Sequence, residues 1–449
     1  MIAFFLVVVL ALLALVHWYV WRRLVRDVTA PRGLARRIGT GVVIALPVLS
    51  VAALASGRAG APFLFQQVVA WPGFLWLAVL LYLVLALAVG EAVRPLLSRW
   101  LARRAAAVPA AAPVTVTAPV TAPVPVPERT AEPGTKADGG PETKVEPEPE
   151  AETEAGAVVE SKAGAVVERP VAPEVSRRLF VARVVGGAAA AAAAGTVANG
   201  AYGVLRGPKV KRVTVPLAKL PRAAHGYRIA VVSDIHLGPI LGRAHSQRIV
   251  DAINATQPDL IAVVGDLVDG TVENLGPAAE PLARLRARHG SFFVTGNHEY
   301  FSGADAWVDH VRELGMRPLR NERLEIPAGF DLAGVDDVAG ESEGQGPDFA
   351  RALGDRDRSR AAVLLAHQPV VIDDAVAHGV DLQLSGHTHG GQLWPGNLLA
   401  ELANPTVAGL ERYGDTQLYV SRGAGAWGPP VRVGAPSDIT VVQLASKQA

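Results

Sequence analysis

Apolar positions in the first quarter of the chain form long runs without charge. Residues 2–21 and 38–57 are each 20 residues long and carry no formal charge, and a third run extends over about 71–90. At ~1.5 Å per residue, a helix of that length spans about 30 Å, the thickness of a bilayer's hydrocarbon core. We therefore predict a membrane domain over residues 1–104 with three transmembrane helices at about these positions.

The arginines around these runs predict the orientation. Residues 1–104 carry 11 Arg and two acids, and the arginines follow the first and third runs, whereas the loop between the second and third runs holds only Arg58. Arg-dense loops stay in the cytoplasm. We expect a multi-pass protein of the cell membrane whose N-terminus lies outside and whose chain after the third span lies inside.

Composition changes sharply after the third run. Residues 105–176 consist mainly of Pro, Ala, Val and Glu, carry five bases and 12 acids, and contain no aromatic residue. Such a segment buries too little apolar surface to offset its chain entropy. We predict a disordered linker.

Residues 177–205 form a separate element with three open interpretations. Arg177 and Arg178 precede an uncharged, Ala- and Gly-rich stretch over 184–205, a pattern that resembles a twin-arginine export signal. A fourth transmembrane helix is the second interpretation, and both lead the chain outward, so that the rest of the chain lies outside the cytoplasm. A soluble Ala-rich helix is the third, and it keeps the rest of the chain in the cytoplasm.

From residue 206 onward, short β-branched runs alternate with helical stretches. This rhythm predicts an α/β domain with a buried sheet over 206–449, and about 240 residues suffice for one sizeable core. The predicted strands are 228–233, 260–264, 292–295, 362–366, 382–385, 418–421 and 439–444.

Polar clusters follow five of these strands, where α/β sheets place their sites. Asp234 with His236, and His387 with His389, have i, i+2 spacing, which in extended backbone lets each pair converge on one point. Carboxylates, imidazoles and one amide suit Mn, Fe, Zn or Co rather than Ca or Mg, and seven ligands suit two ions rather than one. The candidate ligands are Asp234, His236, Asp266, Asn297, His367, His387 and His389.

The ordered motifs D-x-H, G-D, G-N-H-E, H and G-H-x-H occur in sequence between about residues 227 and 444, and this stretch resembles the calcineurin-like metallophosphoesterases. The resemblance implies a four-layer α/β/β/α sandwich and a hydroxide, bridging two metal ions, that attacks phosphorus. It also implies that His298 stabilises charge or protonates the leaving oxygen, and that Asp266 bridges the ions. One metal would take Asp234, His236, Asp266 and His389, and the other Asp266, Asn297, His367 and His387.

A narrower resemblance concerns the membrane-associated branch of that family. It rests on the export-like segment, on Gly390-Gly391-Gln392 and on the tail that contains Arg422 and Arg432. It implies a phosphate-ester or pyrophosphate substrate that is lipid-linked, as in members described as phospholipid or UDP-diacylglucosamine pyrophosphatase-like. Arg422 and Arg432 either grip substrate phosphate or are exposed structural residues.

Other features complete the expectations. We exclude Asp269 and Glu299 from the ligands, since Asp269 can cap a turn and Glu299 can orient His298 or belong to a solvated face. The apolar loop 393–410 is interpreted as core packing, with a lipid-facing wall as the alternative. The domain over 206–449 has 24 bases against 28 acids, which argues against nucleic-acid binding. A non-catalytic binding or sensor module on the same fold is the alternative function, and the complete ligand set argues against it.

Overall fold

The computed structural model describes residues 2–106 and 176–448 of the chain. The predicted disordered linker, 105–176, lies almost wholly outside the described residues.

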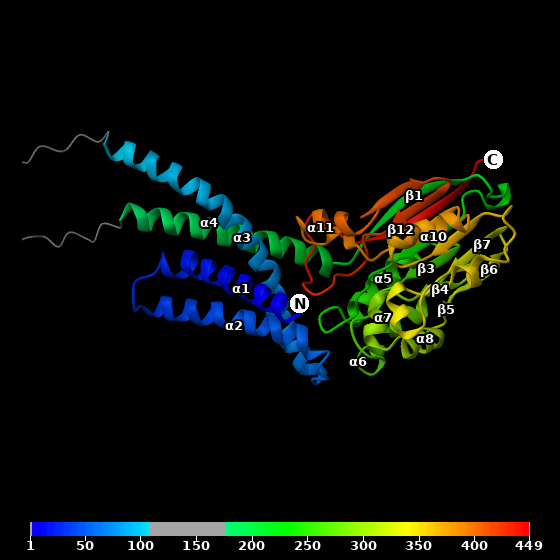
Figure 1. Ribbon diagram of the computed structural model, residues 1–449, viewed down its shortest axis with the longest axis horizontal. Coiled ribbons are helices and arrows are strands. Elements are labelled where there is room, and N and C mark those ends of the chain that lie inside the picture. The colour runs from blue at the N-terminus through cyan, green and yellow to red at the C-terminus, as the bar shows by residue number, and fades with distance from the viewer. Residues whose placement is uncertain (1, 107–175, 449) are drawn as a thin grey trace, which may run out of the picture. The chain divides into compact units, whose positions relative to one another are not determined.

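Four long helices are apolar enough to cross a membrane (Figure 1). They are α1 (Ile2–Trp21), α2 (Leu34–Ser56), α3 (Phe63–Ala106) and α4 (Arg177–Leu205). The helices α1 and α2 match two predicted spans closely, but α3 has 44 residues and continues well beyond the apolar run, with Pro72 and Pro95 inside it. The segment with three interpretations is helical throughout as α4, whose 29 residues exceed the length needed for a span.

The four helices pack through small and apolar side chains. Val20 of α1, Leu87 of α3 and Ala193 of α4 are buried in one cluster. A polar contact joins the segment after α1 to α3, where the Arg23 guanidinium lies 2.7 Å from the Glu91 carboxylate. The Arg-dense segments that follow the first and third runs are therefore adjacent.

The rest of the described chain contains two six-stranded sheets. Their strand orders are β1-β12-β2-β3-β4-β5 and β10-β11-β9-β8-β7-β6. The first sheet comprises β1 (Lys209–Leu217), β12 (Asp438–Ser446), β2 (Arg228–Val232), β3 (Leu260–Val264), β4 (Ser291–Val294) and β5 (Arg317–Pro318). The second comprises β10 (Gly409–Tyr413), β11 (Thr416–Val420), β9 (Leu382–Ser385), β8 (Ala362–Leu365), β7 (Phe330–Gly334) and β6 (Glu322–Ile326).

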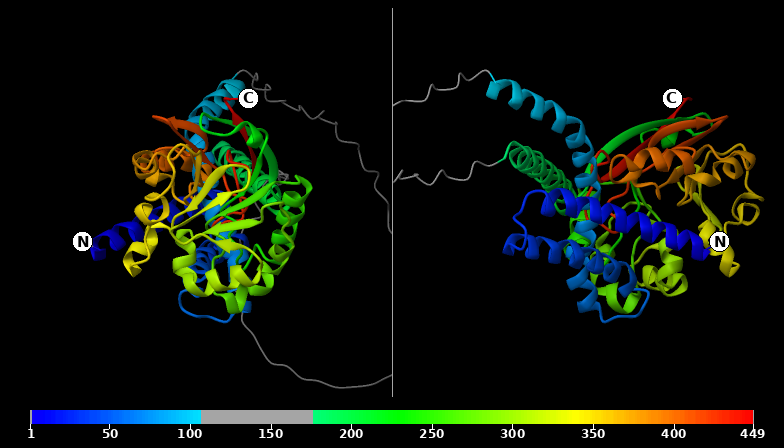
Figure 2. Two further views of the ribbon diagram at one scale, coloured as in Figure 1. Left: turned by 90° about the vertical axis from the view of Figure 1, so that its right-hand side faces the viewer. Right: turned by 60° about the vertical axis from the view of Figure 1, so that its left-hand side comes forward.

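Alternation along the strands builds the layers. In β2, Ile229 and Val231 enter the core between the two sheets, whereas Ala230 and Val232 face the helices outside. The first sheet is covered by α5 (Arg243–Ala255), α6 (Val272–Ala279) and α8 (Ala304–Glu313), and the second by α9 (Phe349–Leu353) and α10 (Ile372–Ala377). Figure 2 shows helices on both sides of the strands. The predicted four-layer α/β/β/α architecture, preceded by long apolar helices, is confirmed.

Five strands were not predicted from the sequence, and four of them are the edges of the two sheets: β1, β5, β6 and β10. Edge strands expose one side to solvent and carry charged residues, as Lys209-Val210-Lys211-Arg212 does in β1. The fifth, β7, is buried but contains Asp331 and ends in Gly334, which weakens its β signal.

Candidate metal centre

The predicted ligands gather where strands of both sheets end. Asp234 and His236 follow β2, and Asp266 follows β3; Asn297 and His298 begin the helix after β4, α7 (Asn297–Ser302). His367 follows β8, and His387 and His389 follow β9. Because β2, β3 and β4 run parallel in one sheet and β8 and β9 in the other, their carboxyl ends meet at one rim.

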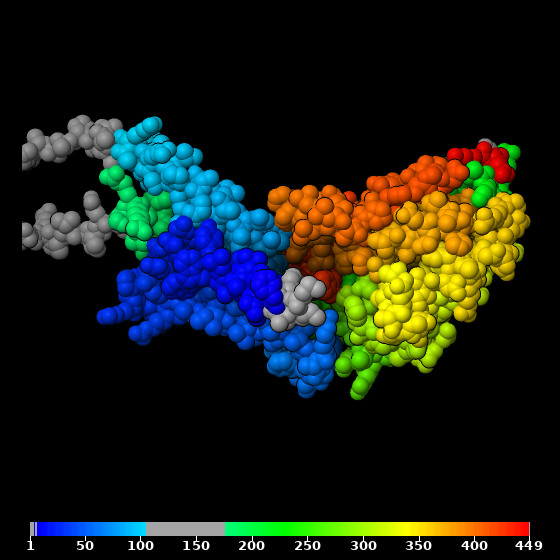
Figure 3. Space-filling view, in the orientation of Figure 1, coloured from blue at the N-terminus to red at the C-terminus, as the bar shows by residue number. Residues whose placement is uncertain are grey.

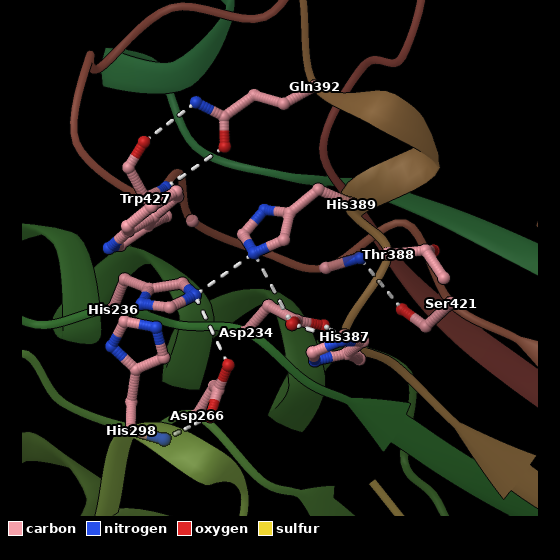
Figure 4. Close-up of polar contacts among 12 residues, drawn as sticks. Asp234, His236, Asp266, His298, His387, Thr388, His389, Gln392, Ser421 and Trp427 are labelled. Atoms are coloured by element: carbon pink, nitrogen blue, oxygen red, sulfur yellow. Dashed lines mark hydrogen bonds and ion pairs between the residues drawn. The ribbon is translucent and has the colours of Figure 1, made fainter. Parts of the chain in front are cut away.

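Two groups of side chains converge at this rim (Figure 4). Asp234, His236 and His389 form one, Asp266, His367 and His387 the other, and within each group the possible ligand atoms lie within 4.8 Å of one another. A third combination joins His236, Asp266 and His298, so Asp266 contacts both groups. Asn297 completes the second group, because its Oδ1 lies 3.0 Å from Nδ1 of His387.

The chemistry of these contacts fits bound cations. Nε2 of His236 lies 3.0 Å from Nε2 of His389, which in turn lies 3.4 Å from Oδ1 of Asp234. Nε2 of His367 is buried without a hydrogen bond, although Oδ2 of Asp266 is 3.1 Å away. Carboxylates and imidazoles gathered in a buried site are costly without partners of opposite charge, and a divalent ion between them offsets that cost. The residues therefore fit a metal centre.

The backbone of the ligands differs from the prediction. Asp234, His236, Asp266, His387 and His389 all have positive φ, between 48° and 72°. The assumption of extended backbone at the i, i+2 pairs is wrong. Asp234 and His236 still converge on one group, but His387 and His389 turn into different groups. Left-handed backbone costs about 1–3 kcal/mol per residue, and it is most often tolerated at Asp, Asn and His in functional sites.

Hydrogen bonds between the loops hold this strained backbone. The buried carboxylate of Glu299 accepts N–H groups of Asp266 (2.9 Å), Leu267 (2.8 Å) and Gly296 (2.7 Å). Burial raises the pKa of Glu299 to about 7. We expected Glu299 to orient His298 or to face solvent, and both expectations are wrong. Its carboxylate instead joins the loop after β3 to the loop after β4. The loops also approach closely at Gly265, which has a φ of 73° and lies against the His367 ring.

Asp269, which was expected only to cap a turn, holds two imidazoles. Its Oδ1 lies 2.8 Å from Nδ1 of His236 and 2.7 Å from Nδ1 of His298. Burial alone would raise the pKa of Asp269, but the two histidines lower it to about 2. The carboxylate therefore fixes the ring orientation of a candidate ligand and directs Nε2 of His298 away from itself. Its position three residues after Asp266 was the available sequence signal.

Arg432 holds another ligand rather than standing exposed. Its side chain is 6% exposed and donates to Nδ1 of His389 (3.0 Å) and to the carbonyls of His389 (3.0 Å), Ala435 (3.2 Å) and Gly425 (2.6 Å). The sequence predicted either a phosphate-binding or an exposed structural arginine, and neither role matches this buried position. Arg432 orients His389 from behind.

Aromatic and apolar side chains surround the open side of the centre. The ring of His298 lies 5.8 Å from Trp427 and 5.5 Å from Phe301, and both aromatic rings are more than half exposed. Gln392 lies three residues after His389. Its side-chain amide donates to the carbonyl of Trp427 and accepts from the backbone N–H of the same residue.

A helix that follows at once, α11 (Gly396–Ala403), exposes leucines. Leu398, Leu399 and Leu402 are 55%, 71% and 85% exposed, and they share one helix face. The segment stands at the surface in Figure 3, orange. Core packing, the preferred interpretation of residues 393–410, is therefore wrong for these leucines.

The fold and this buried His/Asp centre define a metal-dependent phosphoesterase. Residues 227–391 match the family model described as calcineurin-like phosphoesterase. An uncharacterized metallophosphoesterase of Aquifex aeolicus is 35% identical over 243 residues, which cover 53% of this chain and 92% of that protein. The chain belongs to the calcineurin-like metallophosphoesterases and is an enzyme of that class.

Two further relatives extend the likeness. A protein of Danio rerio named transmembrane protein with metallophosphoesterase domain is 40% identical over 255 residues, which cover 54% of this chain and 58% of that protein. An uncharacterized metallophosphoesterase of Helicobacter pylori is 39% identical over 252 residues, 56% of this chain and 67% of the relative. The chain thus spans little more than half the length of the Danio rerio relative.

Replacement of Asp269 tests its positioning role. We expect Asp269→Asn to lower metal affinity or phosphoesterase activity by about 10- to 100-fold, because a neutral amide oxygen holds the two imidazole N–H groups less strongly than the carboxylate does. Metal content by atomic emission and hydrolysis of p-nitrophenyl phosphate measure this, with Asp309→Asn, on an exposed acid of α8, as the control. Equal activity of Asp269→Asn and the control would contradict the assignment.

Proposed function

We propose that the protein is a membrane-anchored, dinuclear metal-dependent phosphoesterase that cleaves phosphate-ester or pyrophosphate bonds of lipid-linked substrates outside the cytoplasm. The observation that carries the proposal is the convergence of seven candidate ligands into two adjacent groups, with Asp266 of one group lying 3.7 Å from His236 of the other. In the proposed centre, one ion is held by Asp234, His236, Asp266 and His389. The other ion is held by Asp266, Asn297, His367 and His387.

The chain's own residues divide the remaining chemistry. Two divalent ions, of which Mn, Fe, Zn or Co suit the ligand set, supply Lewis acidity and a nucleophile from water at neutral pH. His298 supplies the leaving group's proton from Nε2, because its Nδ1 is engaged by Asp269 and its ring is partly exposed at the open side. Asp269, Glu299 and Arg432 keep the reacting groups in place.

Contacts of the apolar helices support the orientation. Nε of Arg183, near the start of α4, donates to the carbonyl of Val28 (3.2 Å), which places the Arg-rich start of α4 beside the segment after α1. The Arg23–Glu91 pair lies at the same end. Farther along α3, the hydroxyl of Tyr82 donates to Trp394 of the phosphoesterase domain (3.0 Å). The segments after the first and third apolar runs hold ten of the 11 Arg of residues 1–104, so we infer that this end lies in the cytoplasm and that the catalytic side is the opposite one, with α4 as a fourth span.

The exposed leucines of α11 support a lipid-linked substrate. Trp394 lies near the start of the apolar segment 393–410, and its side chain is 54% exposed. Its carbonyl accepts the hydrogen bond from Tyr82 of α3. A helix with one leucine face beside a transmembrane helix is suited to lie in the bilayer interface. This places an apolar surface within a few residues of His389, where the acyl part of a substrate would pack.

Loss of the shared carboxylate tests the two-metal centre. We expect Asp266→Ala to lose metal and hydrolysis of both p-nitrophenyl phosphate and bis-p-nitrophenyl phosphate, because the residue serves both ions. His298→Ala should retain the metal and slow turnover by about 10²–10⁴-fold. Metal content and kcat distinguish the two, with Asp305→Ala on the surface as a control. Full activity of Asp266→Ala, or metal loss in His298→Ala, would contradict these roles.

The apolar face predicts a difference between substrates. In vesicles, we expect Leu398→Ser combined with Leu402→Ser to lower the release of phosphate from screened phospholipids at least about tenfold, because two leucines no longer enter the interface. Hydrolysis of p-nitrophenyl phosphate should be unchanged. The matched control is Val370→Ser with Val376→Ser, on exposed apolar residues near α10. The lipid-linked substrate is wrong if the wild type hydrolyses none of the phospholipids.

Sidedness has its own test. In intact cells that express the chain, added protease should digest the domain over 206–449, and an antibody against the C-terminal region can follow its loss. Protection of the domain in cells, with digestion after lysis, would overturn the outward orientation and leave the metal chemistry untouched.

A further inference from the structure

A cavity of about 380 Å³ lies behind the metal centre, where α4 leads into β1. Its volume is in the range of small-ligand sites. Its polar, charged and aromatic lining comes mainly from α4, from the turn after it and from the tail of the chain. These side chains include Asn199, Tyr202, Arg206, Lys209, Arg432 and Ser437.

The cavity wall is positively charged. Arg206, Lys209 and Arg432 line it, and it has no carboxylate in its lining. Among the described residues, no carboxylate lies within ion-pair distance of these three bases, while the nearby Asp438 is paired with Lys211 at 2.5 Å. Asn199 and Ser437 add polar groups that can donate hydrogen bonds to an oxyanion.

Arg432 makes this charge permanent. The side chain is almost fully buried, its guanidinium is fixed by carbonyls and by His389, and none of the described carboxylates forms a salt bridge with it. A buried cation that no carboxylate contacts directly is costly, and an anion in the adjoining cavity offsets part of that cost. Arg206 and Lys209 are exposed, so they are free to close on such an anion.

The position of the cavity identifies a source for the anion. Arg206 directly follows the apolar helix α4, and its guanidinium lies 5.7 Å from the ring of Tyr202. Aromatic and basic side chains at the end of a span lie at the level of lipid headgroups. From residue 206 to residue 233 the chain carries seven bases and no acid.

We propose that this cavity binds a phosphate group, the chemistry shared by anionic phospholipid headgroups and inorganic phosphate. The site is separate from the metal centre and lies on the other side of Arg432. Bound lipid would hold the end of α4 and the first strand of the phosphoesterase domain at the membrane surface. This role is independent of the reaction proposed above.

The full chain is purified in detergent and mixed with phosphatidylglycerol or phosphatidylcholine. Native mass spectrometry then counts the lipids that stay bound. We expect the wild type to bind one more phosphatidylglycerol than Arg206→Gln/Lys209→Gln, whose affinity at that site should fall about 10- to 30-fold. Phosphatidylcholine should show no such difference between the two proteins. Hydrolysis of p-nitrophenyl phosphate should be the same in both, which shows that the variant is folded.

The control removes the same charge from the same basic stretch but outside the cavity. Arg212→Gln/Arg222→Gln changes two exposed arginines and should bind phosphatidylglycerol like the wild type. An equal loss in this control would mean diffuse attraction to anionic lipid and would overturn the proposal.

A second arm distinguishes the source of the phosphate. Inorganic phosphate is titrated against the wild type and Arg206→Gln/Lys209→Gln, so that binding at the metal centre cancels in the comparison. If only phosphate distinguishes the two proteins, the cavity binds the soluble anion; if phosphatidylglycerol does, it binds lipid. If neither ligand distinguishes them, the proposal is wrong.

Discussion

The packing of carboxylate and imidazole groups against one another is the constraint on which the rest of this structure depends. Asp234, His236 and Asp266 are almost completely buried, and two imidazole nitrogens lie 3.0 Å apart. Burying these carboxylates together is unfavourable unless cations or protonated imidazoles balance their charge. It exists because two rigid sheets bring five strand ends to one rim, and because the connecting loops accept left-handed backbone at the ligands.

Groups behind the ligands make this arrangement specific. Asp269 holds two imidazoles at once, Glu299 binds backbone N–H groups of two loops, and Arg432 holds His389. Glu299 and Arg432 are buried and Asp269 is partly buried, and each has more than one partner, so a change at any of them would displace a reacting group. The site is therefore organised from outside inward, with few degrees of freedom left to its ligands.

The apolar helices connect the same centre to the membrane. Tyr82 of α3 donates a hydrogen bond to the carbonyl of Trp394, which lies five residues after His389. At the other connection, α4 leads directly into β1. In the proposed function, a substrate confined to the bilayer surface would meet the metal centre without leaving the lipid layer. The basic cavity at the end of α4 would add a second contact with that surface. Catalysis and anchoring thus share a few short connections.

The sequence by itself predicted the elements whose signals are local: the apolar runs of α1 and α2 and most inner strands, which are continuous β-branched runs. It also predicted seven candidate ligands, six of which lie in the two groups. It did not determine the edge strands, since polar residues there satisfy solvent rather than a core. Only the tertiary structure showed the left-handed backbone of the ligands and gave Asp269 and Arg432 their partners. These outcomes depend on backbone angles and on contacts between residues far apart in the chain, such as Arg432 with His389, which spacing along the sequence does not encode.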